Sequence, residues 1–251
     1  MTNNSLTNYL LRIGDSSLIL GQRMAEWCSN GPFLEEDIAM TNISLDFFGQ
    51  ARSIYSHIAE IDNTGKSEDD YAFGRNERKF YNALITEIPN GHFGDTVTRN
   101  FLFDAFNFHF YTELSKSSNE FLKGFAIKSL KEVNYHLRHS GEWIVRLGDG
   151  TEESKAKIQQ SLIDVWDYTA DMFATNDEIN ELTKEGIAPD YNLIKENWKK
   201  TVSSVIKRAK LTLPEDGYMQ KGSLDGIHSE FLGRMLGEMQ YLHNAHPGAE
   251  W

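Results

Sequence analysis

Apolar side chains at helical spacing between Ile43 and Ile61 constrain the fold more than any other feature of this sequence. They lie on one helical face and comprise Ile43, Phe47, Ile54, Ile58 and Ile61. Acidic residues beginning near Glu35 favour a helix N-terminus there, because the helix dipole is positive at that end. Only five prolines occur in 251 residues, which favours long uninterrupted helices. The pattern predicts a long amphipathic helix that must bury one face against other helices.

The same periodicity predicts further helices along most of the chain. The predicted ranges are 6–28, 71–85, 99–114, 119–147, 152–173, 191–209 and 228–244. No segment alternates apolar and polar residues as a half-buried strand would. Long helices joined by short loops are typical of an up-and-down bundle. The sequence therefore predicts an all-α bundle with additional C-terminal helices, in a single domain covering residues 1–251.

Composition narrows the class of protein. A net charge of −12 disfavours a nucleic-acid partner, because a polyanion would be repelled over most of the surface. The single cysteine, Cys28, excludes an intramolecular disulfide and suits a reducing cytoplasm. The N-terminus has no basic region of a signal peptide, and no apolar run is long enough to span a membrane. We expect a soluble, acidic, cytoplasmic protein.

The segment LKEVNYHLRHSGEW, residues 130–143, raises the question of a metal site. Helical bundles with a two-iron carboxylate centre take a single glutamate from each of two helices and Glu-x-x-His from each of the other two. Three residues before His136 stands Val133, while Glu132 is four residues before it and is rotated by about 100° from the required position. His139 has His136 three residues before it, so it completes no such motif either.

The second long helix offers no better motif. Three residues after Asp46 stands Gly49, and three residues after Phe47 stands Gln50, so neither spacing contains a histidine. The candidate isolated carboxylates are Glu26, Asp104 and Glu113, although acids at such positions are more often solvated or paired.

We therefore predict no catalytic residue and no metal site in this chain. The degenerate ligand positions are Asp46, Gly49, Gln50, Glu132, Val133 and His136. Glu132, His136 and His139 are predicted to form a hydrogen-bonded polar cluster, because a buried imidazole needs polar partners.

With these residues laid out, the chain resembles the C subunits of the bacterial phenylacetyl-CoA 1,2-epoxidases, which are multicomponent monooxygenases. The segments that carry the resemblance span most of the chain, and the final Trp251 belongs to them. They are LRIGDSSLILGQRMAEWC, LDFFGQAR, RNERKFYN, PNGHFGDT, KEVNYHLRHSGEWIVRLGDGT and HSEFLGRMLGEMQYLHNAHPGAEW.

The resemblance implies a ferritin-like fold and a tight complex with a catalytic A subunit. In that family the A subunit keeps both Glu-x-x-His motifs and carries the two-iron centre, and the C subunit serves the integrity of the complex in aerobic phenylacetate degradation. The resemblance thus implies a structural subunit that has no cofactor of its own and borders the site of the substrate, phenylacetyl-CoA.

The resemblance also implies contacts with the CoA ester. The implied residues are Lys79, Phe80, Tyr81, Asn82, Glu181, Leu182 and Thr183. The first group makes independent sense, because Arg75, Arg78 and Lys79 concentrate positive charge that would attract CoA phosphates. The alternative is a solvated helix face on which these cations pair with Glu77 and Asp70.

Residues 99–114, RNFLFDAFNFHFYTEL, carry aromatic side chains almost all round the predicted helix. One bundle core covers only part of a helix, so we expect some of these rings to need another protein. Two rival functions stay open beside the scaffold subunit. One is an autonomous two-iron oxygenase or ferritin-like protein, and the other is a stand-alone CoA-binding or regulatory helical module.

Overall fold

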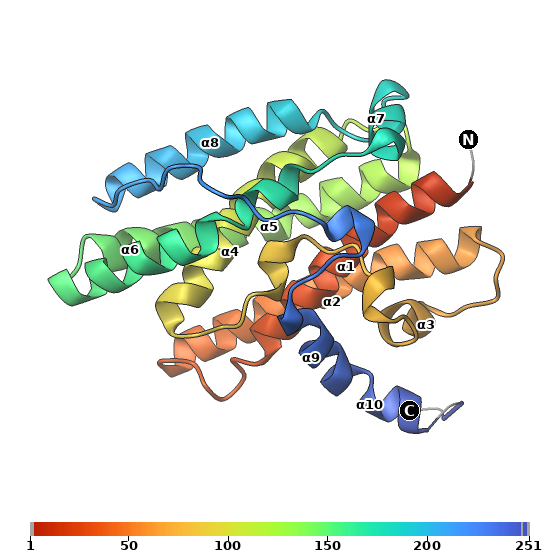
Figure 1. Ribbon diagram of the computed structural model, residues 1–251, viewed down its shortest axis with the longest axis horizontal. Coiled ribbons are helices and arrows are strands. Elements are labelled where there is room, and N and C mark those ends of the chain that lie inside the picture. The colour runs from red at the N-terminus through yellow and green to blue at the C-terminus, as the bar shows by residue number, and fades with distance from the viewer. Residues whose placement is uncertain (1–2, 247, 250–251) are drawn as a thin grey trace. The chain divides into compact units, whose positions relative to one another are not determined.

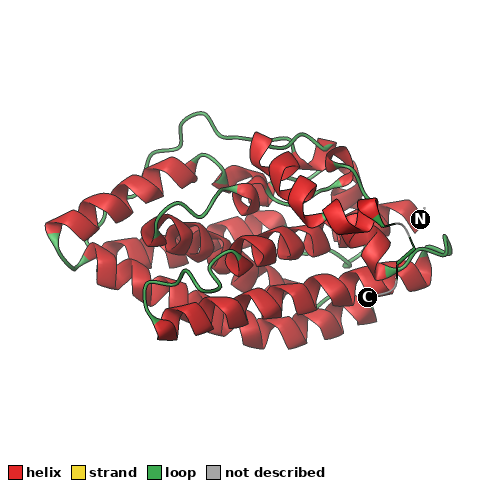
Figure 2. Ribbon diagram, turned by 90° about the horizontal axis from the view of Figure 1, so that it is seen from below, coloured by secondary structure: helices red, strands yellow, loops and turns green. Residues whose placement is uncertain are grey.

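The computed structural model describes residues 3–246 and 248–249 of the chain, so Trp251 lies outside the described residues. Helices and loops account for all of them, and no strand occurs within these ranges (Figure 2). The all-α, ferritin-like prediction is confirmed. The chain divides into two compact units, Met1–Glu87 with Gly222–Trp251 and Ile88–Lys221. The single-domain assignment stays a prediction.

Unit 1 is built on a long antiparallel helix pair, α1 (Asn3–Ala25) and α2 (Leu34–Ile61), joined by a short loop (Figure 1). Four members of the predicted apolar stripe of α2 are buried, and Ile61, in its last turn, is partly exposed. The smaller elements of the unit are α3 (Glu68–Phe73), η1 (Glu77–Lys79), η2 (Leu84–Glu87), η4 (Ser223–Asp225), α9 (Glu230–Met239) and α10 (Tyr241–Ala245).

Unit 2 contains a second antiparallel pair, α4 (Phe93–Leu114) and α5 (Glu120–Gly148), which Figure 1 shows side by side. Its other elements are α6 (Glu152–Trp166), η3 (Thr169–Phe173), α7 (Asp177–Lys184) and α8 (Tyr191–Arg208). The indole of Trp198 in α8 donates a 2.8 Å hydrogen bond to the carbonyl of Leu102 in α4, so α8 is fastened to the α4 backbone.

Some predicted helix boundaries are wrong, because local capping decides where these helices begin. α3 begins at Glu68 because Ser67 and Asp70 form a reciprocal capping box, and the predicted helix 71–85 is replaced beyond Phe73 by loops and two 3₁₀ turns. His92 caps α4, which therefore begins six residues before the predicted Arg99. The predicted helices 152–173 and 228–244 are each interrupted, and α7 was not predicted.

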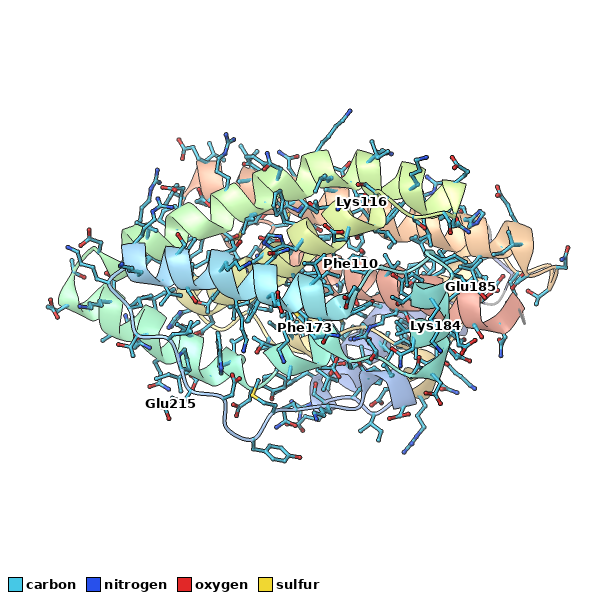
Figure 3. All side chains as sticks on the ribbon, turned by 90° about the horizontal axis from the view of Figure 1, so that it is seen from above. Phe110, Lys116, Phe173, Lys184, Glu185 and Glu215 are labelled. Atoms are coloured by element: carbon cyan, nitrogen blue, oxygen red, sulfur yellow. The ribbon has the colours of Figure 1, made fainter. Side chains whose placement is uncertain are left out.

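The aromatic side chains of α4 are mostly covered by the protein's own helices, so among the phenylalanines of residues 99–114 only Phe108 keeps appreciable exposed surface for another protein. Phe101, Phe103, Phe106 and Phe110 are buried, and Phe108 is partly exposed. Figure 3 labels Phe110 and Phe173, whose rings both lie 5.4 Å from the ring of Phe106. Helices α5, α6 and α8 contact α4, which explains how one helix can bury rings around most of its circumference.

None of the helices in the described ranges combines the length and the apolar character that crossing a membrane would require.

Candidate functional site

The burial of side chains on α5 shows which of its residues occupy the inward positions where metal ligands would lie. Val133 and His136, three residues apart, both have 0% exposure, whereas Glu132 is partly exposed. The i and i+3 positions that would hold Glu-x-x-His therefore hold Val133 and His136. A valine side chain has no donor atom, so this half of a two-iron site cannot form.

Asp104 of α4 is the carboxylate that the structure brings to His136. The hydroxyl of Ser140 lies 2.7 Å from Asp104 Oδ2 and 2.9 Å from the carbonyl oxygen of His136, and its one proton is shared between these two acceptors. Burial raises the pKa of Asp104 to about 6, although the neighbouring His136, the Ser140 hydrogen bond, His139 and Arg99 act in the opposite direction. Asp104, one of the candidate isolated carboxylates, is thus a buried carboxyl group that is paired within the bundle with Ser140.

The α2 half lacks ligands for the same reason. Phe47 and Gln50 are buried at 1% and 3% exposure, while Asp46 is partly exposed and Gly49 is exposed. The inward i and i+3 pair is therefore Phe47 and Gln50, which offers neither a carboxylate nor an imidazole. Neither α5 nor α2 supplies the pair of ligands that a two-iron carboxylate centre requires of such a helix.

The other two candidate carboxylates are held by neighbouring cations near the surface. Glu26 lies beyond the end of α1 and accepts from Arg23 at 2.9 Å. Glu113, in the last turn of α4, accepts from Lys116 at 2.7 Å. Neither glutamate is presented to the core as a ligand.

The implied CoA-contact segment, residues 79–82, runs from the last residue of η1 into the loop before η2, in unit 1. Lys79 is exposed and Tyr81 is partly exposed, while Phe80 and Asn82 have 0% exposure. Only Lys79 and Tyr81 can therefore offer side chains to a ligand outside the protein. Phe80 and Asn82 instead hold the segment in place from within.

A buried ion pair fixes this segment to α1. Arg75 Nη1 donates to Asp15 Oδ2 at 3.0 Å, and its guanidinium lies 4.1 Å from the ring centroid of Phe80. Burial opposes the charge of Arg75, but Asp15 and Tyr55 outweigh it and raise the arginine pKa. The alternative pairing with Asp70 does not hold for Arg75, because Asp70 caps α3.

A second buried pair joins this segment to the C-terminal part of unit 1. His228 Nδ1 lies 2.6 Å from Glu87 Oε1, and neither side chain has exposed surface. Burial acts against a charged imidazole, but the hydrogen bond and charge of Glu87 outweigh it, so the pKa of His228 is raised. Sequence reasoning missed Asp15, Glu87 and His228. Of these three residues, only Asp15 could have been noticed in the sequence, because it interrupts an apolar run that must be buried.

The second implied CoA-contact group, Glu181, Leu182 and Thr183, lies in α7 of unit 2. Glu181 is exposed and pairs with Lys184 at 3.3 Å. Leu182 is buried, and the hydroxyl of Thr183 donates to the carbonyl of Ile179 at 2.9 Å. Figure 3 labels Lys184 and Glu185 at the end of this helix.

The outer face of α2 carries an apolar stripe that the described residues leave uncovered. Leu34, Ile38 and Leu45 are 71%, 52% and 60% exposed, and their spacing of four and seven residues places them on one side of the helix. Glu35 and Asp46 lie beside this stripe in the helical register. An exposed apolar stripe bordered by acids is typical of a surface that meets another protein.

Comparison with known proteins agrees with this geometry. The model of the family described as phenylacetic acid catabolic protein matches residues 1–251. A relative from Escherichia coli (strain K12), named as the C subunit of 1,2-phenylacetyl-CoA epoxidase, is 43% identical over 248 residues, which cover 99% of this chain and 100% of the relative. The resemblance drawn from the sequence motifs is confirmed. The chain belongs to the phenylacetic acid catabolic protein family.

Proposed function

We propose that this chain is the non-catalytic C-type subunit of a phenylacetyl-CoA 1,2-epoxidase complex in aerobic phenylacetate degradation. The observation that carries the proposal is the pair of inward ligand positions filled by Val133 and Phe47, neither of which has a donor atom. The relative that is 43% identical is itself named as a subunit of such an epoxidase. A chain with this face therefore serves the complex by binding rather than by oxygen chemistry.

The partner in this proposal is an A-type subunit that holds a two-iron centre, and both act in the cytoplasm. The exposed stripe of Leu34, Ile38 and Leu45 supports a protein partner, since no described residue covers it. Glu35 and Asp46 flank the stripe, and the chain has a net charge of −12. These acids favour a partner that carries basic groups beside its own apolar surface, and they disfavour a second copy of this chain, which would present like charges.

The CoA ester would be met by the segment 79–82. Lys79 offers an exposed ammonium group for a phosphate, and Tyr81 offers a partly exposed ring and hydroxyl. The buried Phe80 and Asn82 would shape the segment rather than touch the ligand. The α7 group would contribute through the exposed Glu181, whose negative charge suits hydrogen-bond donors of the ester rather than its phosphates.

Co-expression with an A-type subunit tests the assignment. We expect the two chains to elute together in size-exclusion chromatography, and we expect phenylacetyl-CoA epoxidation to require both once electrons are supplied. Turnover by this chain alone would contradict the non-catalytic role. Failure to co-elute at micromolar concentration would contradict the partnership.

Exchange of charge at Lys79 tests the substrate contact. Lys79→Glu replaces attraction of a phosphate with repulsion, which corresponds to roughly 1–3 kcal/mol for a partly desolvated contact. We expect a higher KM of the complex for phenylacetyl-CoA with little change in kcat, since this contact is equally present in ground and transition states. Lys128→Glu, an exposed lysine of α5, makes the same change in charge and should leave KM unaltered. Equal KM values for Lys79→Glu and the parent at low salt would refute the contact.

A further inference from the structure

The ring of His228 lies between two groups that can only accept hydrogen bonds. Its Nδ1 is 2.6 Å from a carboxylate oxygen of Glu87, and its Nε2 is 2.8 Å from the carbonyl oxygen of Phe80. A neutral imidazole carries a single N–H, so it could satisfy only one of them. Two acceptors at these distances require both nitrogens to be protonated, which makes His228 an imidazolium ion.

Glu87 accepts hydrogen bonds from three further donors beside this ring. Its Oε1 also accepts from Asn82 Nδ2 at 2.9 Å, and its Oε2 accepts from the amide and the hydroxyl of Ser229 at 2.8 and 2.6 Å. Four donors on one buried carboxylate stabilise its negative charge. The pair is therefore a charged clasp, formed by His228, Glu87 and the Phe80 carbonyl, with no exposed side-chain surface.

Other contacts bring the same two segments together. Gly226 has a φ of +66°, and a Cβ added there would lie 2.4 Å from the carbonyl oxygen of Arg78, so only glycine permits this approach. Arg12 Nη1 donates both to Ser223 Oγ at 2.8 Å and to the carbonyl of Tyr81 at 3.2 Å. The C-terminal segment 222–229 thus packs against residues 78–81 through backbone as well as side chains.

The clasp acts on the backbone of the proposed CoA-contact segment. His228 holds the carbonyl of Phe80, Arg75 holds that of Lys79 at 2.8 Å, and Asp15 accepts from the amide of Tyr81 at 2.8 Å. Lys79 and Tyr81, the residues whose side chains reach the surface, flank the carbonyl that His228 holds. Loss of this hydrogen bond would leave the peptide group between Phe80 and Tyr81 held only through its N–H, by Asp15.

We propose that His228 is a positioning residue, which as an imidazolium fastens the C-terminal segment to Phe80 and Glu87 and thereby orients Lys79 and Tyr81 toward the CoA ester. The role in CoA binding rests on the proposed function, while the clasp itself does not. His228 touches neither substrate nor cofactor in this proposal. It acts through the Phe80 carbonyl.

The clasp has a defined dependence on pH. The facing charged groups are Glu87 on η2, Asp15, Arg12 and Arg23 on α1, Arg75 before η1, and Asp225 and Glu230 beside His228 on its own segment. Burial lowers the pKa of His228, but Glu87, the Phe80 carbonyl and Asp15 together raise it by more, so it exceeds 6.5. A group whose pKa is raised on folding stabilises below its unfolded pKa and loses that effect as pH rises through the folded value. The clasp is therefore complete below pH 6.5 and weakens as pH rises through the raised pKa.

The protonation state is measured directly on the unmodified chain. Ring nitrogen chemical shifts in NMR distinguish an imidazolium from either neutral tautomer. We expect both nitrogens of His228 to carry protons at pH 6.5 and the ring to lose one only above that pH. A neutral His228 ring at pH 6.5 would overturn the proposal, whatever the variants do.

His228→Gln tests the mechanical role, because glutamine is uncharged and carries both of its N–H donors on a single nitrogen, whereas the two acceptors lie at different nitrogens of the imidazole ring. We expect hydrogen exchange of amides 79–83 and 230–239 in the full chain to speed up in this variant, and to lose the pH dependence that the parent shows above pH 6.5. His243→Gln, in the neighbouring α10, is the matched control and should exchange like the parent. Unchanged exchange in His228→Gln would overturn the clasp.

Steady-state kinetics of the complex test the role in CoA binding. We expect His228→Gln to raise KM for phenylacetyl-CoA by about tenfold, the size of one lost charge-assisted contact, with kcat retained. If Lys79→Glu raises KM and His228→Gln does not, the positioning role is overturned while the CoA contact stands. If neither variant changes KM, the CoA contact of the proposed function is refuted, and the positioning role is refuted with it. The hydrogen-exchange data would still test the clasp itself.

Discussion

At the scale of single residues, the chain buries titratable side chains inside a helix pair, at the depth where a metal centre would need its ligands. Asp104 is buried beside Ser140 and His136, and its Oδ1 has no hydrogen-bond partner within the described part of the chain. Sequence spacing predicted that Val133 breaks the α5 motif, because the i and i+3 rule depends only on helix geometry. It could not predict the environment of Asp104, since burial depends on which helices cover the residue.

The raised pKa of Asp104 gives a testable dependence of stability on pH. Its pKa is about 6 in the folded chain, against roughly 3.9 in an unfolded one, so the folded state binds the proton more tightly. Stability should therefore fall as pH rises from about 4 to about 6, by roughly 3 kcal/mol in total. Asp104→Asn mimics the protonated group, so it should lack this loss and be at least as stable as the parent at pH 7.

Urea unfolding of the parent and Asp104→Asn at pH 4, 5, 6 and 7 measures the difference. Asp164→Asn, an exposed position of α6, controls for the change in net charge. If the parent and Asp104→Asn shared one pH profile, the carboxyl group would not be titrating in this range.

At the scale of helices, apolar periodicity predicted the long elements well and the short ones poorly. The start of α5 was predicted to within one residue because Asn119 is a typical N-cap, whereas the cap of α4 is His92, which is not among the residues that usually signal a helix start. The covering of α4 could not be predicted either. It depends on η3 and α8, which begin more than 50 residues after α4 ends.

The rings of α4 should now matter for folding rather than for assembly. Phe110 is 3% exposed and lies 5.9 Å from the ring of Tyr191, so Phe110→Ala should lower the free energy of unfolding by about 3–5 kcal/mol. Phe108 is partly exposed, and Phe108→Ala should cost clearly less. Thermal and urea unfolding of the two variants decide this, and equal losses would show that the burial pattern of α4 is misassigned.

The apolar stripe of α2 should matter for assembly rather than for folding. Leu34→Asp places a charge on a side chain that is 71% exposed, so the free energy of unfolding should change by no more than about 0.5 kcal/mol. Affinity for the A-type subunit should fall at least about tenfold, because the charge would have to be desolvated at the interface. Leu193→Asp, on an exposed leucine of α8, is the control. Titration by calorimetry that gave equal affinities for the two variants would exclude the stripe from the interface.

At the scale of the whole molecule, two helix pairs supply the ferritin-like elements and long-range ion pairs tie down the rest of unit 1. The family and the helical class could be predicted from motifs and periodicity. The contact between His228 and Glu87 joins residues 141 positions apart, and that between Arg75 and Asp15 joins residues 60 apart. No local pattern encodes such pairs, so they emerged only from the structure.

Iron bound per chain tests most directly the claim that this protein supports, but does not perform, the oxygen chemistry. Elemental analysis after anaerobic loading with Fe(II) and desalting would be made on the chain alone, on Val133→Glu, and on the complex with an A-type subunit. The account predicts no stoichiometric iron on this chain or on Val133→Glu, because Phe47 and Gln50 still provide no ligand set on α2. It predicts two irons for each A-type subunit in the complex. Two irons per chain on this protein alone, with the spectrum of a bridged pair, would contradict it.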